Sequence, residues 1–358
     1  MDEKVKLAVI LGAGASHDVC CGDETEVKTV PKLQPPMIET LFKGAFDEVL
    51  RHHPDAQSLL ATVRNLMQGK RSKLTFEDAL RRQLESDDED VLRRVRDVPF
   101  ALHDYFWRVS EEYTSDPINY SDLVNRTAKN GIDTAFVTVN YDTLLEKALS
   151  NVTGVEFGEE EKYVQPRKNF TLAKLHGSVG WGYPWTDVAG KANRRQQLSR
   201  LPEFDVSCLH VGLDDNLTYR DLFCYPALAL PVPGKGEFIC PKTHLSALRD
   251  FLSDCQNYLF IGFSANDTDV LKLLRECVRN ARLVGLVVAK KDRPGVEDRL
   301  ALGARIFSAA DVFPQPEDDN DGFTWFLRNR LDEFVDIVKG KPSTIVIGGP
   351  KLRRKPPH

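Results

Sequence analysis

Two short polar stretches in the middle of the chain carry side chains that could do chemistry. The first is Asn140-Tyr141-Asp142, and the second is His176-Gly177-Ser178. A side-chain amide can orient a hydroxyl group or a water molecule, and an imidazole can remove its proton near neutral pH. The two stretches together therefore predict a site that positions a nucleophile and deprotonates it.

Apolar runs place both stretches at the ends of strands. Residues 136–139 and 171–175 are predicted to be buried strands, and a helical pattern follows the first of them. Strand-to-helix turns at the carboxyl edge of an open α/β sheet are where such folds bind ligands. We therefore expect Asn140 and His176 to lie together at this edge. Asp142 either orients the site or caps the following helix, and a buried structural histidine is the alternative for His176.

Two further strand-to-helix turns are predicted at the same edge. The strand at 5–11 leads into Gly12-Ala13-Gly14-Ala15-Ser16, and the strand at 258–261 leads into Gly262-Phe263-Ser264-Ala265-Asn266-Asp267. Glycines allow the backbone to approach a pyrophosphate, whose charge a helix amino terminus favours. The third glycine of G-x-G-x-x-G is replaced by His17, which argues against a hydride-transfer dehydrogenase. The alternatives without a ligand are a tight turn for the glycines and helix capping for residues 264–267.

The composition is that of a soluble globular protein. Of 358 residues, 42% are hydrophobic and 28% are charged, and the net charge of -5 argues against a surface that coats nucleic acid. No apolar stretch approaches 18 residues and no signal peptide is recognisable, so we expect a cytoplasmic protein without a membrane span. Seven cysteines without a C-x-x-C pair argue against a disulfide framework or a four-cysteine zinc site, and no metal is expected.

Alternating strands and helices predict an α/β fold, a Rossmann-like doubly wound parallel sheet with an inserted helical subdomain. The sheet domain is assigned to residues 1–36 and 130–339, and the helical subdomain to residues 37–129. Residues 340–358 form a basic carboxy-terminal tail. Within the sheet domain, residues 182–243 show little periodicity and are predicted to form a loop-rich cap with short strands.

Four motifs, taken in order, resemble the sirtuin superfamily, whose members bind NAD. They are Gly12-Ala13-Gly14-Ala15-Ser16, Thr138-Val139-Asn140-Tyr141-Asp142, Leu175-His176-Gly177-Ser178 and Ile261-Gly262-Phe263-Ser264. The Asn-Tyr-Asp and Gly-Phe-Ser-x-x-Asp variants are similar to the bacterial sirtuin-like branch found in antiphage defence proteins, as is Phe76-Glu77-Asp78-Ala79-Leu80. The zinc-ribbon cysteines and the Gly-Ile-Pro-Asp-Phe-Arg loop of the deacetylases are not visible, which weakens protein deacylation as the activity.

The resemblance implies an NAD glycohydrolase that releases nicotinamide and ADP-ribose, acting as an antiviral effector that depletes cellular NAD. It implies that Asn140 and His176 are catalytic and that no cofactor is needed beyond NAD as the substrate. The residues expected to contact the diphosphate are Gly12, Ala13, Gly14 and Ser16. The adenosine half would meet Gly262, Ser264 and Asp267, and the remaining nucleotide contacts would come from Thr138 and Asp142.

Two other functions stay open on the sequence, namely a non-enzymatic module that senses NAD or ADP-ribose and an NAD-dependent protein deacylase. At 358 residues, we expect no room for a large sensor domain after the sheet. We therefore expect a homo-oligomer, a separate activator or a translocase ATPase partner, as the family resemblance suggests, and no direct nucleic-acid binding.

Overall fold

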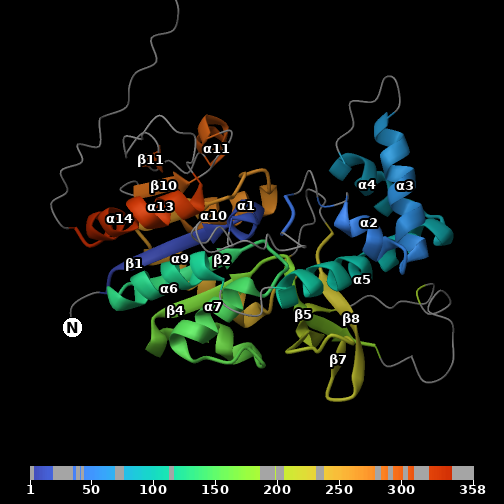
Figure 1. Ribbon diagram of the computed structural model, residues 1–358, viewed down its shortest axis with the longest axis horizontal. Coiled ribbons are helices and arrows are strands. Elements are labelled where there is room, and N and C mark those ends of the chain that lie inside the picture. Colours follow the sequence, from blue (N-terminus) through green and yellow to red (C-terminus); the bar gives the residue numbers. More distant parts are fainter. Residues whose placement is uncertain are drawn as a thin grey trace, which may run out of the picture.

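A seven-stranded sheet forms the central layer of the protein (Figure 1). The computed structural model describes residues 4–18, 35–37, 41, 44–68, 76–112, 117–185, 198, 205–230, 238–278, 284–288, 293–300, 305–309 and 322–340. The strand order is β11-β10-β9-β1-β2-β4-β3, and only β3 runs antiparallel to its neighbour. The strands are β1 (Lys6–Leu11), β2 (Asp133–Thr138), β3 (Val164–Gln165), β4 (Phe170–Lys174), β9 (Asn257–Ile261), β10 (Val284–Val288) and β11 (Arg305–Ser308). The predicted parallel α/β sheet is thereby confirmed.

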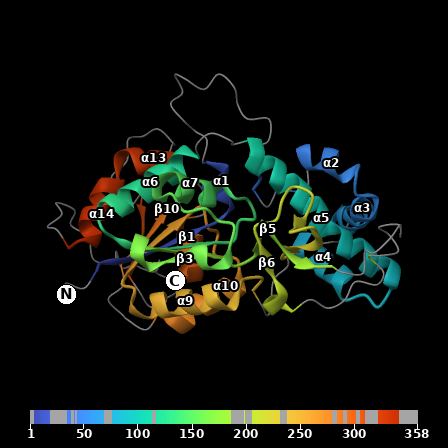
Figure 2. The ribbon, with the colours of Figure 1, turned by 90° about the horizontal axis from the view of Figure 1, so that it is seen from below.

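Helices cover both faces of this sheet, as the uninterrupted apolar runs required. Successive residues of β1 point to opposite faces, so Leu7 and Val9 pack in one buried cluster and Ala8 and Ile10 in the other. The first face is covered by α6 (Ile118–Lys129), α7 (Leu144–Thr153), α13 (Phe323–Asn329) and α14 (Leu331–Val338). The second face carries α9 (Lys242–Asp254), α10 (Thr268–Cys277) and α11 (Arg293–Leu300), and Figure 2 shows α9 and α10 on the side opposite α6 and α7.

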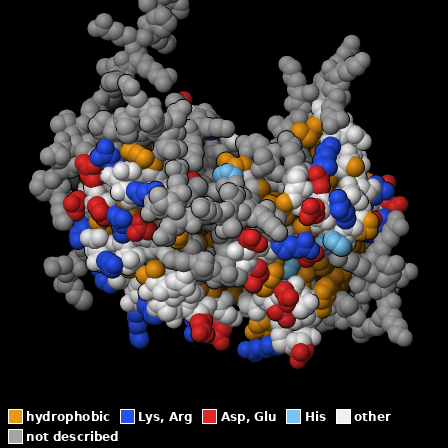
Figure 3. Space-filling view, in the orientation of Figure 1, with side chains coloured by type: hydrophobic (Ala, Val, Ile, Leu, Met, Phe, Trp, Pro, Cys, Tyr) orange, Lys and Arg blue, Asp and Glu red, His pale blue; other side chains and the backbone are white. Residues whose placement is uncertain are grey.

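A separate group of helices lies beyond the carboxyl edge of the sheet (Figure 1). It consists of α2 (Ala45–Leu50), α3 (Pro54–Gln68), α4 (Phe76–Leu84) and α5 (Glu89–Glu112). In the described part of this surface, acidic and basic side chains are interspersed (Figure 3). The helix α6 was assigned to this subdomain on the sequence, but it packs on α7, α13 and α14 beside the sheet. The helical group observed in the structure therefore ends with α5.

A four-stranded antiparallel sheet occupies the region expected to be a loop-rich cap. Its order is β6-β5-β8-β7, and its strands are β5 (Gly177–Pro184), β6 (His210–Val211), β7 (Thr218–Tyr219) and β8 (Leu222–Leu228). The ring of Phe100 in α5 packs against Trp185, Phe223 and Tyr225, with centroid distances of 6.3, 6.3 and 5.3 Å. Aromatic packing thus joins the small sheet to the helical group.

Several sequence predictions fall on residues outside the described ranges. They concern the basic tail beyond residue 340 and two of the seven cysteines, Cys20 and Cys21. None of the five cysteines that the structure describes is part of a disulfide. Within the same ranges, no helix has both the length and the apolar composition that a membrane span would require.

Candidate active site

The carboxyl ends of four neighbouring strands meet at one edge of the sheet. Leu11 at the end of β1 is in register with Thr138 of β2 and with Ile261 of β9, and Thr138 is in register with Lys174 of β4. The parallel register therefore brings the four predicted polar turns to the same edge. Asn140 and His176 each follow by two residues the paired positions Thr138 and Lys174, so they come from adjacent strand ends as predicted.

The turns after β1 and β9 touch through their backbones. The N–H of Gly12 donates to the carbonyl of Ile261 at 3.0 Å, and the N–H of Gly14 donates to the carbonyl of Gly262 at 3.1 Å. A Cβ atom at Gly12 would lie 2.4 Å from the Gly262 oxygen, and Gly262 itself has a φ of +58°. The glycines are therefore explained by this close approach alone. Contact with a diphosphate by Gly12, Ala13 and Gly14 remains a prediction, and α1 (Ala13–His17) has only five residues.

The side chain of Asn140 is held in one orientation. Its Nδ2 atom donates to the Gly12 carbonyl and to the Ser16 hydroxyl, each at 2.9 Å. Its backbone N–H donates at 3.0 Å to the hydroxyl of Thr138, which donates to the Leu11 carbonyl at 3.2 Å. A backbone carbonyl only accepts hydrogen bonds, so the amide nitrogen must face Gly12. The Oδ1 atom of Asn140 consequently points the other way, as an acceptor.

Ser16 and Tyr120 form a buried pair of hydroxyl groups next to the Asn140 amide. The Ser16 hydroxyl lies 2.9 Å from the Tyr120 hydroxyl, and both residues are almost fully buried. Burial, with a further contribution from the negative charge of Asp142, raises the pKa of Tyr120 well above its usual value. The phenol therefore stays protonated. Tyr120 was not predicted from the sequence, because it lies 104 residues from Ser16 and carries no local motif.

Asp142 lies in a buried charge cluster. Its Oδ1 atom accepts a hydrogen bond from the Leu144 N–H at 3.2 Å, which is the capping role considered as an alternative. Burial raises the pKa of the Asp142 carboxyl, while the charge of Lys174 and a hydrogen bond from Ser16 oppose this shift. The Lys174 ammonium group donates to the Asp142 carbonyl and lies 2.8 Å from Glu146 Oε1. Asp142 is thus a buried residue that holds the start of α7 beside the site.

Neither Lys174 nor Glu146 was recognised as part of the site from the sequence. Lys174 stands inside the apolar run that forms β4 and is fully buried, and Glu146 is in the first turn of α7 and is 4% exposed. A lysine within a strand whose other residues are all apolar or threonine is the signal that could have been used, because buried lysines require an anionic partner.

His176 contacts the predicted turn at residues 262–267. Its Nε2 atom lies 2.8 Å from Oδ2 of Asp267, and the two side chains are 14% and 23% exposed. The other oxygen of Asp267 accepts hydrogen bonds from the N–H groups of Asp269 and Val270, each at 3.0 Å, and so caps α10. The capping alternative and a contact with the candidate base are therefore both realised. Contacts of Asp267 with an adenosine remain a prediction.

Ser264 lies apart from the hydrogen bonds that surround Asn140. Its side chain is exposed, and its carbonyl accepts hydrogen bonds from Nε and Nη2 of Arg299 at 3.0 and 2.8 Å. Its predicted role toward the adenosine half is not tested by these contacts.

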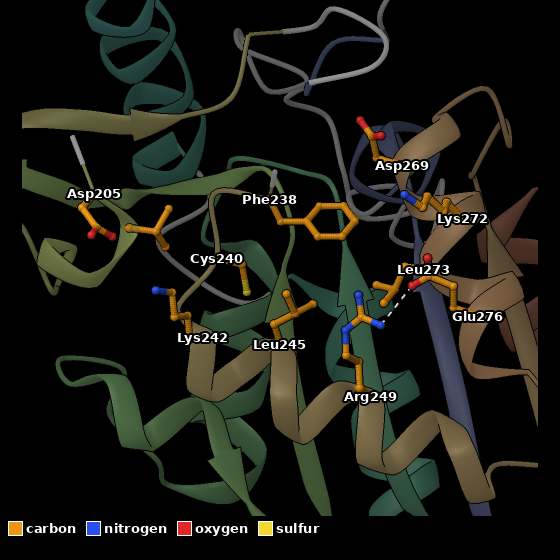
Figure 4. A pocket seen from close by; sticks show the side chains of 11 residues that line it. Asp205, Phe238, Cys240, Lys242, Leu245, Arg249, Asp269, Lys272, Leu273 and Glu276 are labelled. Carbon is orange, nitrogen blue, oxygen red and sulfur yellow. Dashed lines mark hydrogen bonds and ion pairs between the residues drawn. The ribbon is translucent and has the colours of Figure 1, made fainter. Parts of the chain in front are cut away.

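A groove runs between α9 and α10 (Figure 4). Its volume is about 570 Å³, within the size range of small-molecule sites. Its lining combines an apolar floor with charges of both signs, from Asp205, Val206, Phe238, Cys240, Lys242, Leu245, Arg249, Asp269, Lys272, Leu273 and Glu276. Arg249 and Glu276 are paired at 3.1 Å. Phe238 and Cys240 lie on either side of Ile239, whose backbone forms a β-bridge with His176, and His176 itself is not a lining residue of the groove.

Comparisons with known proteins found similar structures but no similar sequences. No protein-family model matches the chain, and no curated protein matches it. A Sir2 complex with a p53 peptide and NAD+ is 15% identical, with 93% of this chain and 95% of that chain covered and a TM-score of 0.41. A Sir2 homologue in complex with NAD is 15% identical, with 94% of this chain and 91% of that chain covered and a TM-score of 0.40. Sir2Tm bound to a propionylated peptide is 15% identical, with 93% of this chain and 94% of that chain covered and a TM-score of 0.40.

These neighbours are Sir2 structures. At this identity and TM-score they assign no role to any residue of this chain. The antiphage branch remains a prediction.

Proposed function

We propose that this protein hydrolyses NAD at the bond between nicotinamide and ribose, releasing nicotinamide and ADP-ribose. The observation that carries the proposal is the pairing of a fixed amide with an imidazole at adjacent strand ends. Asn140 presents Oδ1 as an acceptor because Gly12 and Ser16 hold its nitrogen, and His176 follows the neighbouring strand. An acceptor and a base are what the hydrolysis of this bond requires.

The chemistry needs no strong acid. The C–N bond breaks with its electron pair moving to the positively charged nicotinamide ring, which leaves as a neutral molecule, and the ribosyl carbon passes through an oxocarbenium-like state. In this proposal Asn140 Oδ1 accepts a hydrogen bond from a ribose hydroxyl or from the attacking water. His176 takes the proton that the water loses as its oxygen bonds to the ribosyl carbon. The net products are nicotinamide, ADP-ribose and one proton.

The biological role that we propose is depletion of cytoplasmic NAD during virus infection. The support is the resemblance of the Asn-Tyr-Asp and Gly-Phe-Ser-x-x-Asp motifs to the antiphage branch. Assembly into a homo-oligomer, or contact with an activator or translocase ATPase, is proposed on the same resemblance. NAD is the substrate, and no further cofactor is invoked.

The test is nicotinamide release from NAD by the purified protein, followed by chromatography. Asn140→Ala and His176→Gln are each expected to reduce the rate by about 10²–10⁴-fold. Asn216→Ala and His52→Gln, at exposed positions, serve as matched controls and are expected to leave the rate unchanged. Activity that survives both site substitutions would contradict the proposal. Binding of NAD without turnover would support a sensing module in its place.

The groove between α9 and α10 favours a second candidate function, an NAD-dependent protein deacylase. A deacylase needs room for an acyl-lysine peptide next to the nucleotide, and two lining residues of this groove of about 570 Å³, Phe238 and Cys240, flank Ile239, whose backbone bridges to His176. Nicotinamide release that depends on an acylated peptide, and that Leu273→Trp in the groove abolishes, would support this function. Release that is independent of any peptide supports the glycohydrolase.

A further inference from the structure

Asp267 makes two different sets of contacts with its two carboxylate oxygens. Oδ1 accepts the N–H groups of Asp269 and Val270 at the start of α10, each at 3.0 Å. Oδ2 lies 2.8 Å from Nε2 of His176. We propose that Asp267 is a positioning residue that fixes the tautomer and the direction of the His176 ring, which makes Nδ1 the nitrogen that accepts the proton. This inference rests on the proposed function of the site.

The tautomer follows from the chemistry of the two groups. An ionised carboxylate can only accept a hydrogen bond, so the nitrogen that faces Asp267 must carry the hydrogen. A neutral imidazole has one N–H group, and Nε2 holds it here. Nδ1 then carries the lone pair and is the basic nitrogen of His176. When Nδ1 takes the proton of the attacking water, the ring becomes an imidazolium ion, and Asp267 stabilises it through the Nε2–H group while remaining ionised.

The carboxylate comes from a strand that is not adjacent to the strand of the histidine. His176 follows β4 and Asp267 follows β9, and β2 and β1 lie between these strands in the sheet. Neighbouring strands are about 4.8 Å apart, so three steps span about 14 Å. The His176–Asp267 contact must therefore cross above the ends of β1 and β2, from which Gly12 and Asn140 come. The pair would close one side of the space in front of the Asn140 amide.

Capping of α10 makes Asp267 a rigid support for the ring. Two backbone N–H groups hold Oδ1, so the direction of Oδ2 is set before His176 reaches it. A side chain fixed in this way orients a catalytic group without paying conformational entropy at the moment of reaction. If His176 had no catalytic role, the Asp267 carboxylate would serve only as a helix cap. Substitutions that keep the cap but lose the contact with His176 distinguish these two roles.

The test separates capping from positioning with two substitutions. Asp267→Asn keeps the cap, because asparagine caps helices as well as aspartate does. Its amide can donate to Nε2 and so move the ring hydrogen to Nδ1. Asp267→Ser also retains a capping oxygen, but its side chain is too short to reach His176. Both are expected to lower kcat by about 10²–10⁴-fold with little change in KM. Asp214→Asn, an exposed aspartate that accepts N–H groups of its own turn, is the control and should leave kcat unchanged.

Nitrogen NMR of histidine-labelled protein reports the tautomer without any turnover. At a pH where the ring is neutral, His176 of the wild-type protein should show a protonated Nε2, and Asp267→Asn should show a protonated Nδ1. A wild-type ring protonated on Nδ1 would overturn the inference, as would unchanged kcat in both Asp267 variants of an active enzyme. If the expected tautomers are seen but the wild-type protein does not cleave NAD, the proposed function fails while the contact and its effect on the ring stand.

Discussion

Removing the buried ammonium group of Lys174 should destabilise the whole protein. Lys174 is fully buried, and its Nζ atom lies 2.8 Å from Oε1 of Glu146, whose side chain is 5% exposed. The other contacts of this oxygen, with the hydroxyl groups of Tyr163 and Ser178, are both 3.4 Å long. Lys174→Met would therefore leave a buried carboxylate with only two long hydrogen bonds to compensate its charge.

The expected loss follows from the cost of an unpaired buried charge. Removing one partner of a buried ion pair lowers the free energy of unfolding by about 3–5 kcal/mol, whereas replacing both partners by apolar residues often leaves it nearly unchanged. Domains are stable by about 5–15 kcal/mol, so the single substitution removes roughly a fifth or more of that stability. With a urea m-value of about 3 kcal/mol/M, the midpoint of unfolding should fall by roughly 1–2 M.

The assay is urea unfolding of four proteins: wild type, Lys174→Met, Glu146→Leu and the double variant. The double variant should recover most of the stability that Lys174→Met loses, which would give a large coupling energy. The control is the exposed pair of Lys162 and Glu159, at 3.6 Å, where Lys162→Met should cost less than about 1 kcal/mol. The reasoning is refuted if Lys174→Met costs no more than this control, or if the double variant is as unstable as Lys174→Met.

Three other substitutions test the remaining contacts of the site. Ser16→Ala removes one of the two acceptors of the Asn140 amide. The free energy of unfolding should therefore fall by about 1 kcal/mol, and the rate of nicotinamide release should fall several-fold. Unchanged values in both assays would contradict the hydrogen bond between Asn140 and Ser16. Burial raises the pKa of Asp142, so the folded state binds its proton more tightly than the unfolded state. Wild-type stability should therefore gain from this group as pH falls through the raised pKa toward about 3.9, and Asp142→Asn should raise Tm at pH 8 more than at pH 5; the opposite order would count against the assignment. Gly12→Ala would place a Cβ 2.4 Å from a backbone oxygen and should abolish soluble folded protein, whereas Gly158→Ala, with nothing within 4 Å, should fold normally in circular dichroism and gel filtration.

Part of the candidate site could be predicted because it depends on local sequence and on one rule of parallel sheets. Apolar runs at 136–139 and 171–175 identified β2 and β4 to within a few residues. Polar turns after parallel strands must lie at one edge, so the placement of Asn140 and His176 at the same edge followed without knowledge of the strand order. That their strands are neighbours is a property of the strand order. The glycines were located correctly as a turn, although the structure explains them by the approach of the β9 turn.

Secondary structure was harder to predict where the local pattern is weak or where a neighbour decides the packing. The strand β5 contains three glycines within eight residues, and its pairing with β8 has a register shift, so no period of two was evident from the sequence. The helix α6 has an ordinary amphipathic pattern, which shows that it packs against something but not against which layer.

The sequence by itself determined β1, β2, β4 and β9, the edge at which their polar turns gather, and the residue types available there. Only the tertiary structure decided which of these side chains meet. Asp267 reaches His176 across two intervening strands, and Tyr120 reaches Ser16 from a helix 104 residues away. The physical reason is that local propensity and burial periodicity act over a few residues, whereas these contacts depend on the order of strands in the sheet and on the packing of helices across it.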